Sequence, residues 1–352
     1  MPPIPTAIFF PGQASEAPAM LAPILRRFPS IARDGIDAIS QALPDDPDLP
    51  TIIDLLNGSS ADNDKRLLLQ RTAIAQPCNL LAAILTYRVI LQSPWWMAHC
   101  ASNPTTTVYF GHSLGQITAF TAAGAIPLVD AIKIVRERGL AMEQVMADFD
   151  ISAVSKYGML AVPIKNNTTT SEFIAKVRDA AKKLPSSVIV DCANFNSPTQ
   201  VVLSGQVTAL DKIATELGLG RKSKYLPVRI PFHSRLLRPV EGRVRAAVDS
   251  ASVTMPPSAL HFLRNSDANP ITTSQDMRDA IVTGCWEPVD WVRSVRTVQQ
   301  QFGVKRWIGI GPGSAITTTL VERSLLPSAS DHHDIIAFDP IKPGSGWDVI
   351  SG

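Results

Sequence analysis

One short motif, Gly111-His112-Ser113-Leu114-Gly115, restricts the fold of this chain more than any other feature. The run Thr106 to Phe110 before it is typical of a buried strand, and Gln116 to Gly124 after it is typical of a helix. A serine in G-x-S-x-G between a strand and a helix lies on a sharp turn that lifts its hydroxyl clear of the sheet. The pattern therefore predicts an α/β fold with Ser113 as a nucleophile.

Length and composition are those of a globular protein. The 352 residues suffice for one large domain or two ordinary ones, and 45% hydrophobic with 18% charged residues exclude a disordered chain. The net charge of +2 gives no reason to expect nucleic acid or a membrane surface as a partner. The four scattered cysteines predict reduced thiols in the cytoplasm, and the N-terminus lacks the pattern of a signal peptide. The apolar stretch Cys78 to Leu91 carries Arg88 and predicts a buried helix, opened by Gln76-Pro77, with no membrane span.

The expected elements divide the chain into two units. Large-unit strands are predicted at Thr6 to Phe10, Leu260 to Leu263 and Trp307 to Ile310. Between them, strands at Met159 to Ile164, Val188 to Ala193, Gln200 to Leu203 and Lys224 to Ile230 alternate with two helices in the order β-α-β-β-α-β, which is typical of a ferredoxin-like unit. We predict a hydrolase-like large domain with a central parallel sheet (residues 1–154 and 229–325), an inserted ferredoxin-like subdomain (155–228) and a C-terminal tail (326–352) with one candidate short strand at Ile335 to Phe338.

A helix hairpin is expected directly after the motif. The helix from Ser113 travels roughly 16 Å before Gly124 ends it, at about 1.5 Å per residue. Pro127 begins a second helix, and Arg138 lies about three turns along it. If the two helices are antiparallel, Arg138 returns level with Ser113.

His233 is the histidine best placed to serve as the base for Ser113. It follows the expected strand Lys224 to Ile230, and ligand sites of open α/β sheets form at the carboxyl ends of strands. His112 points away from the nucleophile, which favours a structural role. No acidic residue between Ser113 and His233 is suitably placed, so we expect a dyad whose imidazole is oriented by a backbone carbonyl.

Several motifs, in order, resemble those of the malonyl-CoA:acyl carrier protein transacylase family, and the match runs from about residue 6 to residue 323. They are Phe10-Pro11-Gly12-Gln13, the Gly111 to Gly115 motif, Arg138-Gly139, Asn194-Phe195-Asn196-Ser197-Pro198, Pro231-Phe232-His233-Ser234, Pro288-Val289-Asp290-Trp291 and Gly311-Pro312-Gly313. Any one of them is weak, but together they are specific.

The resemblance implies a ping-pong acyl transfer from malonyl-CoA to the phosphopantetheine thiol of an acyl carrier protein. Ser113 would attack the thioester and His233 would move its proton. The backbone N–H groups of Leu114 and Gln13 would hold the oxyanion, and Arg138 would bind the free malonyl carboxylate. No metal or redox cofactor is implied.

The resemblance also implies which residues line the acyl pocket, and it shows where this sequence departs from the family pattern. Asn196 is similar to a residue lining the acyl pocket, and Phe232 resembles the form associated with malonyl instead of branched acyl groups. Three positions differ from the family pattern: Gln116 replaces a usual glutamate, Ala14 a glycine, and Gly284 a glutamine near the histidine. We interpret all three as ordinary divergence. If the residue at 284 orients the imidazole through its backbone carbonyl, glycine still serves.

An arginine cluster follows the histidine, at Arg235, Arg238, Arg243 and Arg245. Arg238 and Arg245 are two helical turns apart and share a face, whereas Arg235 joins them only if the helix begins before Pro239. We favour a solvated charged face. The alternative is a docking surface for CoA phosphates or an acidic carrier protein.

Three alternatives remain open from the sequence. An acyltransferase dedicated to one polyketide assembly line would share every motif, so fatty-acid and polyketide roles are not separated. A serine hydrolase, such as a thioesterase or lipase, uses the same serine turn with water as acceptor, but Arg138 beside Ser113 argues against an apolar lipase pocket. A non-catalytic carrier-binding module is disfavoured because Ser113, His233 and Arg138 are all present.

Overall fold

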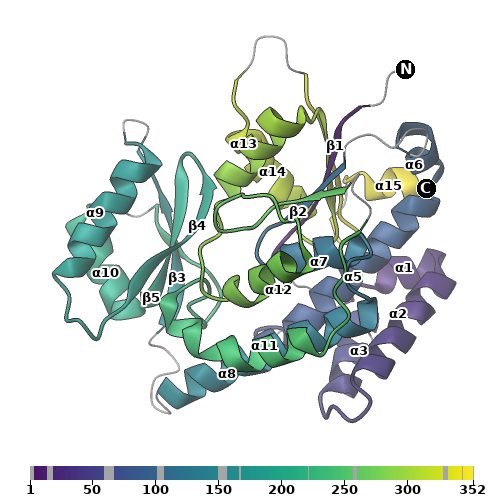
Figure 1. The fold of residues 1–352 in the computed structure, drawn as a ribbon, viewed down its shortest axis with the longest axis horizontal. Helices are drawn as coiled ribbons and strands as arrows, with labels where there is room; N and C mark the ends of the chain where they lie inside the picture. Colours follow the sequence, from purple (N-terminus) through teal and green to yellow (C-terminus); the bar gives the residue numbers. More distant parts are fainter. Residues whose placement is uncertain are drawn as a thin grey trace.

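The computed structural model describes residues 4–13, 19–58, 67–100, 107–149, 157–165, 168–220, 222–256, 260–327, 332–342 and 344–351. These residues form two sheets with helices packed around them (Figure 1). The larger sheet and its helices make up most of the molecule, and the smaller sheet lies at one side with helices α9 (Thr170–Lys182) and α10 (Val207–Glu216) on its outer face. The predicted mixed α/β fold with a central parallel sheet is confirmed.

The larger sheet has five strands in the order β7-β2-β1-β8-β9, and every neighbouring pair is parallel. The strands are β1 (Thr6–Phe10), β2 (Thr107–Gly111), β7 (Leu260–Phe262), β8 (Arg306–Ile310) and β9 (Asp334–Phe338). Phe10 is paired with Gly111, so β1 and β2 end together. The loop after β1 and the turn after β2 therefore meet at the carboxyl edge of the sheet, where open α/β sheets bind ligands.

Helices cover both faces of this sheet, which explains why its strands are continuous apolar runs. Ile8 and Phe10 of β1 contribute to one apolar cluster, and Ala7 and Phe9 contribute to another on the opposite face. The surrounding helices are α1 (Ala22–Arg27), α2 (Pro29–Ala42), α3 (Leu49–Asn57), α5 (Thr72–Gln92), α6 (Pro94–His99), α7 (Leu114–Ala122), α8 (Leu128–Phe149), the 3-10 helix η1 (Arg235–Val240), α11 (Glu241–Asp249), α12 (Ser274–Thr283), α13 (Trp291–Phe302), α14 (Ser314–Ser324) and α15 (Trp347–Ser351).

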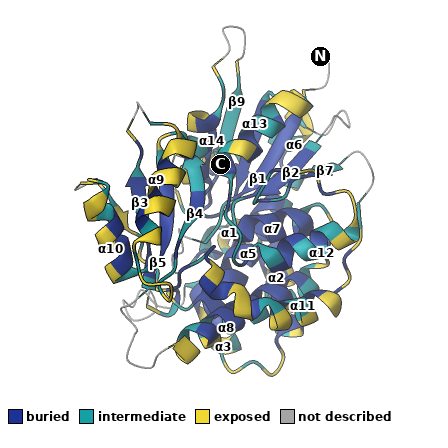
Figure 2. Cartoon of the chain, turned by 60° about the vertical axis from the view of Figure 1, so that its left-hand side comes forward, coloured by how far each residue is buried: buried dark blue, intermediate teal, exposed yellow. Residues whose placement is uncertain are grey.

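Helix α5 is buried on nearly all sides, and buried residues run through it and α7 in the middle of the molecule (Figure 2). It is the one helix in the described ranges that is long and apolar enough to cross a membrane, yet 89% of its most apolar window lies inside the protein. The predicted buried helix is confirmed, but its predicted start is wrong. The helix begins at Thr72, so Pro77 lies inside it and cannot donate to the carbonyl of Ala73. That carbonyl instead accepts a hydrogen bond from Nη1 of Arg136 at 2.8 Å.

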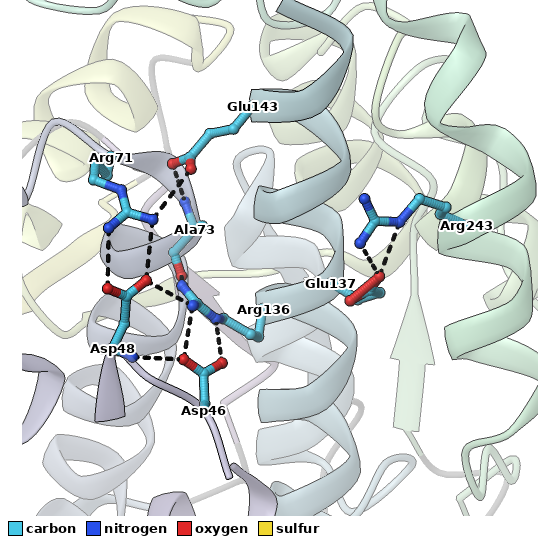
Figure 3. Close-up of polar contacts among 8 residues, drawn as sticks. All are labelled: Asp46, Asp48, Arg71, Ala73, Arg136, Glu137, Glu143 and Arg243. Carbon is cyan, nitrogen blue, oxygen red and sulfur yellow. Dashed lines mark hydrogen bonds and ion pairs between the residues drawn. The ribbon is translucent and has the colours of Figure 1, made fainter. Parts of the chain in front are cut away.

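Arg136 also carries the main ion-pair network of the larger unit (Figure 3). Its Nε lies 2.7 Å from Oδ2 of Asp46, and its Nη2 lies 2.8 Å from Oδ2 of Asp48. Arg71 pairs with Asp48 and with Glu143, whose Oε1 accepts the backbone N–H of Ala73. The network ties α8 to the segment between α2 and α3 and to the first turn of α5.

The smaller sheet has four antiparallel strands in the order β4-β5-β3-β6. They are β3 (Tyr157–Pro163), β4 (Val190–Ser197), β5 (Gln200–Gln206) and β6 (Lys224–Tyr225). One apolar face packs under α9 and α10, and the other carries Met159, Ala193 and Val202 with Phe232 beside them. The predicted strand Lys224 to Ile230 is too long, because only its first two residues pair with β3.

The prediction of a tail over residues 326–352 requires a correction. β9 pairs with β8 along its whole length, and Phe338 at its end is buried. Trp347 is also buried and packs edge-on against Phe28. The apolar run Ile335 to Phe338 is a candidate strand in the sequence, but the Pro- and Ser-rich composition around it favoured a tail, because its partner is the free edge of β8.

We expect Arg136→Ala to lower the free energy of unfolding by about 3 kcal/mol, because it leaves two carboxylates without their buried partner. The matched control is Arg243→Ala, which breaks the exposed pair with Glu137 in Figure 3. That control should cost less than about 1 kcal/mol. Urea unfolding monitored by circular dichroism measures both, and equal losses in the two variants would contradict the account of the network.

Candidate active site

The turn between β2 and α7 has the predicted geometry. Ser113 has φ 55° and ψ −116°, a conformation that side-chain-bearing residues rarely adopt. A Cβ at Gly111 would lie 2.1 Å from the carbonyl carbon of Gly115, and one at Gly115 would lie 2.1 Å from the backbone oxygen of Phe10. Both positions therefore require glycine, and the predicted strand, turn and helix around Ser113 are confirmed.

Asn265, just beyond the neighbouring strand β7, holds this strained turn through two hydrogen bonds. Its Nδ2 donates to the carbonyl of Gly111 at 2.7 Å, and its Oδ1 accepts the backbone N–H of Ser113 at 2.7 Å. Asn265 follows shortly after β7, the strand paired with β2. Sequence reasoning missed this role, and the available signal was an asparagine just beyond a strand of the same sheet.

Ser113 and His233 form a hydrogen-bonded pair. Oγ of Ser113 lies 2.7 Å from Nε2 of His233, and Nδ1 of His233 lies 2.8 Å from the carbonyl oxygen of Glu287. A carbonyl only accepts, so Nδ1 carries the proton and Nε2 is free to accept from the serine hydroxyl. The side chains thus form a dyad oriented by a backbone carbonyl, as the sequence predicted.

Two details of the predicted base differ from the structure. His233 does not stand at a strand end, because β6 ends at Tyr225 and an irregular segment with Pro227 and Pro231 leads to it. Its φ of 57° is again unusual for a residue with a side chain. The orienting carbonyl belongs to Glu287, whereas the carbonyl of Gly284 faces Arg138.

Arg138 is a buried cation that lacks an anionic partner among the described residues. Its exposed fraction is 4%. Nη1 donates to Oε1 of Gln76 at 2.8 Å, Nη2 donates to the carbonyl of Gly284 at 3.4 Å, and Nε has no partner in the described structure. Both acceptors are neutral. A buried charge with only neutral partners is costly, so this position is suited to an anionic ligand.

A single pocket of about 510 Å³ contains the dyad and the guanidinium. It lies between the carboxyl edge of the larger sheet and the smaller sheet. One side is polar, with Ser113, His233, Arg138 and the loop after β1. The opposite side is apolar, with Met159, Ala161, Val202, Leu226, Val228 and Phe232. Such a pocket can bind an acyl chain whose far end carries a negative charge.

The remaining predicted residues also line this pocket. The backbone N–H of Leu114 is the first of α7, where N–H groups have no acceptor within the helix. Gln13 lies in the loop beside it, and its Oε1 accepts from Thr72 at 2.9 Å. The oxyanion role of both N–H groups stays a prediction. Phe232 packs on the apolar side.

Asn196 lies in β4, which continues beyond the predicted strand end at Ala193. Two register irregularities, between Cys192 and Asn194 and between Phe195 and Ser197, allow the strand to continue through it. Its Oδ1 accepts from Nε2 of His112 at 2.8 Å, joining the smaller sheet to the turn that carries Ser113. His112 therefore has the structural role that the sequence favoured.

The departures from the family pattern have local explanations. Gln116 is buried, and its Nε2 donates to the carbonyl of Leu263 at 2.9 Å, which a glutamate could not do. A Cβ at Gly284 would lie 2.7 Å from the carbonyl oxygen of Ala280. Ala14 lies outside the described residues.

Most arginines of this cluster pair with carboxylates, which agrees with the interpretation of the cluster as a solvated charged face. Arg235, Arg243 and Arg245 pair with Asp191, Glu137 and Asp279 respectively. Helical structure does begin before Pro239, as the 3-10 helix η1.

Comparisons with known proteins find similarity to malonyl-CoA:acyl carrier protein transacylases. It is 29% identical over 313 residues to the malonyl CoA-acyl carrier protein transacylase of Escherichia coli, covering 88% of this chain and 90% of that protein. The crystal structure of the transacylase FabD of Xanthomonas oryzae pv. oryzae matches with a TM-score of 0.77, at 27% identity over 99% of this chain and 98% of that one. A malonyl-transacylase bound to its type II polyketide synthase acyl carrier protein (PlMCAT with AntF) matches with a TM-score of 0.75, at 25% identity over 95% of each chain. No protein-family model matches. The predicted resemblance to the malonyl-CoA:acyl carrier protein transacylases is confirmed.

The dyad should react over a wide pH range. Burial and the charge of Arg138 lower the pKa of His233 from 6.5 to about 3, although the bond to the Glu287 carbonyl opposes this. The imidazole therefore stays neutral, and able to accept a proton, well below neutral pH. We expect fluorophosphonate labelling of Ser113 to keep a nearly constant rate between about pH 8 and pH 5. Mass spectrometry of the labelled peptide measures the rate, and a fall with its midpoint at the usual histidine pKa would contradict this electrostatic account.

Proposed function

We propose that this protein transfers a malonyl group from coenzyme A to the phosphopantetheine thiol of an acyl carrier protein through a malonyl-Ser113 intermediate. The observation that carries the proposal is the buried guanidinium of Arg138, which shares a pocket with the Ser113–His233 dyad and has only neutral partners in the described structure. The similarity to transacylases of that name supports it.

The first half-reaction loads the serine. Oγ of Ser113 attacks the thioester carbonyl while Nε2 of His233, 2.7 Å away, takes the hydroxyl proton. The tetrahedral intermediate collapses, the C–S bond breaks, and the imidazolium returns the proton to the departing CoA sulfur. The Glu287 carbonyl keeps Nδ1 protonated throughout, so Nε2 remains the atom that exchanges protons.

The oxyanion of that intermediate needs donors already in place. The N–H groups of Leu114 and Gln13 supply them, at the start of α7 and in the loop after β1. Preorganised donors of this kind contribute about 3 kcal/mol each to transition-state stabilisation. The paired ends of β1 and β2 bring these two segments together.

Arg138 selects the acyl group. Its planar guanidinium binds the free malonyl carboxylate through a two-pronged, charge-assisted pair, which satisfies the buried charge. An acetyl group has no such carboxylate and leaves the cation uncompensated. Discrimination therefore comes from the cost of an unpaired charge as much as from the new bonds.

The second half-reaction reverses the first with a different thiol. His233 accepts the proton of the phosphopantetheine thiol, and the sulfur attacks the malonyl ester. The C–Oγ bond breaks, and Ser113 recovers its proton from Nε2. Because the pKa of His233 is lowered, the histidine is neutral and ready at the start of each half.

The finer architecture belongs to this proposal. A hydrolase-like unit (residues 1–154 and 229–325) carries the dyad and Arg138, and a ferredoxin-like unit (155–228) supplies the apolar wall and Asn196. The order of strands β4-β5-β3-β6, with α9 and α10 on one face, supports the second assignment. A cytoplasmic location fits this role. A fatty-acid and a polyketide pathway are both compatible with the site.

We expect Arg138→Ala to reduce malonyl loading of Ser113 by roughly a hundredfold, because about 3 kcal/mol of charge-assisted binding is lost. Acetyl loading should hold or rise. Arg138→Lys should restore malonyl loading only in part, since lysine offers a point charge and no fork. Intact-mass analysis after incubation with each acyl-CoA gives the ratio. An unchanged malonyl-to-acetyl preference in Arg138→Ala would show that the substrate assignment is wrong.

A further inference from the structure

A buried hydrogen-bond chain runs from Arg138 to the loop after β1. Nη1 of Arg138 donates to Oε1 of Gln76 at 2.8 Å, and Nε2 of Gln76 donates to Oγ1 of Thr72 at 2.8 Å. The Thr72 hydroxyl then donates to Oε1 of Gln13 at 2.9 Å. Gln76 and Thr72 have no exposed surface. This row of hydrogen bonds therefore connects the Arg138 guanidinium to the loop that contributes Gln13 without passing through solvent.

The direction of every bond in this chain is set by Arg138. A guanidinium only donates, so Gln76 must turn its carbonyl oxygen toward it and its NH₂ group toward Thr72. Oγ1 of Thr72 accepts that bond, which leaves its single proton for Gln13. Thr72 thus supports the orientation of the Gln76 amide that Arg138 sets.

Helix α8 contains two buried arginines whose partners differ in charge. Arg136, with a side-chain exposure of 5%, pairs with the carboxylates of Asp46 and Asp48. Among the described residues, Arg138 donates to the amide oxygen of Gln76 and the carbonyl of Gly284, and its remaining polar neighbour is the buried thiol of Cys285. A carboxylate at position 76 would reach the same nitrogen atom, because glutamate has the shape of glutamine. The amide is therefore the feature that leaves the charge of Arg138 available.

We propose that Gln76 is a specificity-determining residue, which orients Arg138 through a neutral acceptor and so keeps its positive charge for the carboxylate of the acyl group. Thr72 is a positioning residue that holds the Gln76 amide in the required orientation. The inference rests on the proposed function for the identity of the acyl group. The neutral pairing itself is independent of it.

The decisive variant is Gln76→Glu, which keeps the shape of the side chain and adds a charge that pairs with Arg138. Malonyl loading of Ser113 should fall by about ten- to a hundredfold, the range expected for losing a charge-assisted interaction. Acetyl loading should be unchanged or faster. The matched control is Gln76→Met, which removes the hydrogen bond but gives the cation no anionic partner. It should load more slowly yet keep the preference for malonyl over acetyl.

A second measurement needs no acyl-CoA. A glutamate at position 76 adds a negative charge that offsets the effect of the Arg138 charge on His233, so fluorophosphonate labelling of Ser113 should lose rate at a higher pH in Gln76→Glu than in Gln76→Met. For Thr72, replacement by valine should slow malonyl loading and replacement by serine should preserve it, because only serine keeps the hydroxyl. Thermal unfolding of each variant confirms that it is folded.

The outcomes separate the inference from the function on which it rests. A folded Gln76→Glu protein with the wild-type malonyl-to-acetyl ratio and the labelling profile of Gln76→Met would overturn the inference. A wild-type protein that malonyl-CoA does not load would instead contradict the proposed function. The shift of the labelling profile would then still decide whether Gln76 leaves the charge of Arg138 without an anionic partner.

Discussion

The buried charge of Arg138 is the interaction on which the rest of this site depends. This cation is only 4% exposed, and its hydrogen-bond acceptors are an amide and a backbone carbonyl. Such a buried charge is unfavourable unless helix α8 is held firmly in place and a ligand supplies the missing anion. Arg136 holds α8 in place. It pairs with carboxylates, and its hydrogen bond to the Ala73 carbonyl joins α8 to α5. That carbonyl is available because Pro77 has no N–H to donate to it, so the hydrogen bond missing within α5 is replaced by one to α8.

The reacting groups are held in strained backbone that surrounding hydrogen bonds support. Ser113 and His233 both have positive φ, a conformation that usually persists only where the neighbouring structure imposes it. Asn265, which follows β7, holds the serine turn, and the carbonyl of Glu287 holds the imidazole. Their partners come from segments far away in the chain, so the geometry of the dyad is a property of the whole larger unit.

Local patterns made much of this predictable. The strand, glycine turn and helix at Ser113 follow from sterics, and the position of Arg138 follows from the lengths of two consecutive helices. The contributions of Asn265, Gln76 and Glu287 could not be predicted, because they are set by contacts between distant segments. The apolar run of β9 indicates a strand, but its place in the larger sheet could not be predicted because it depends on the free edge of β8. Asn196 stays in a strand only through register irregularities, for which the local sequence gives no signal.

The central claim is that Ser113 carries a malonyl group between two thiols. It is tested most directly by incubating the protein with malonyl-CoA, adding a phosphopantetheinylated acyl carrier protein, and following both proteins by mass spectrometry. The account predicts one malonyl group on the Ser113 peptide, which then moves to the carrier. Free malonate released as fast with the carrier as without it, with the carrier still unloaded, would contradict transfer. An adduct that persists unchanged in Ser113→Ala would contradict the assignment of the nucleophile.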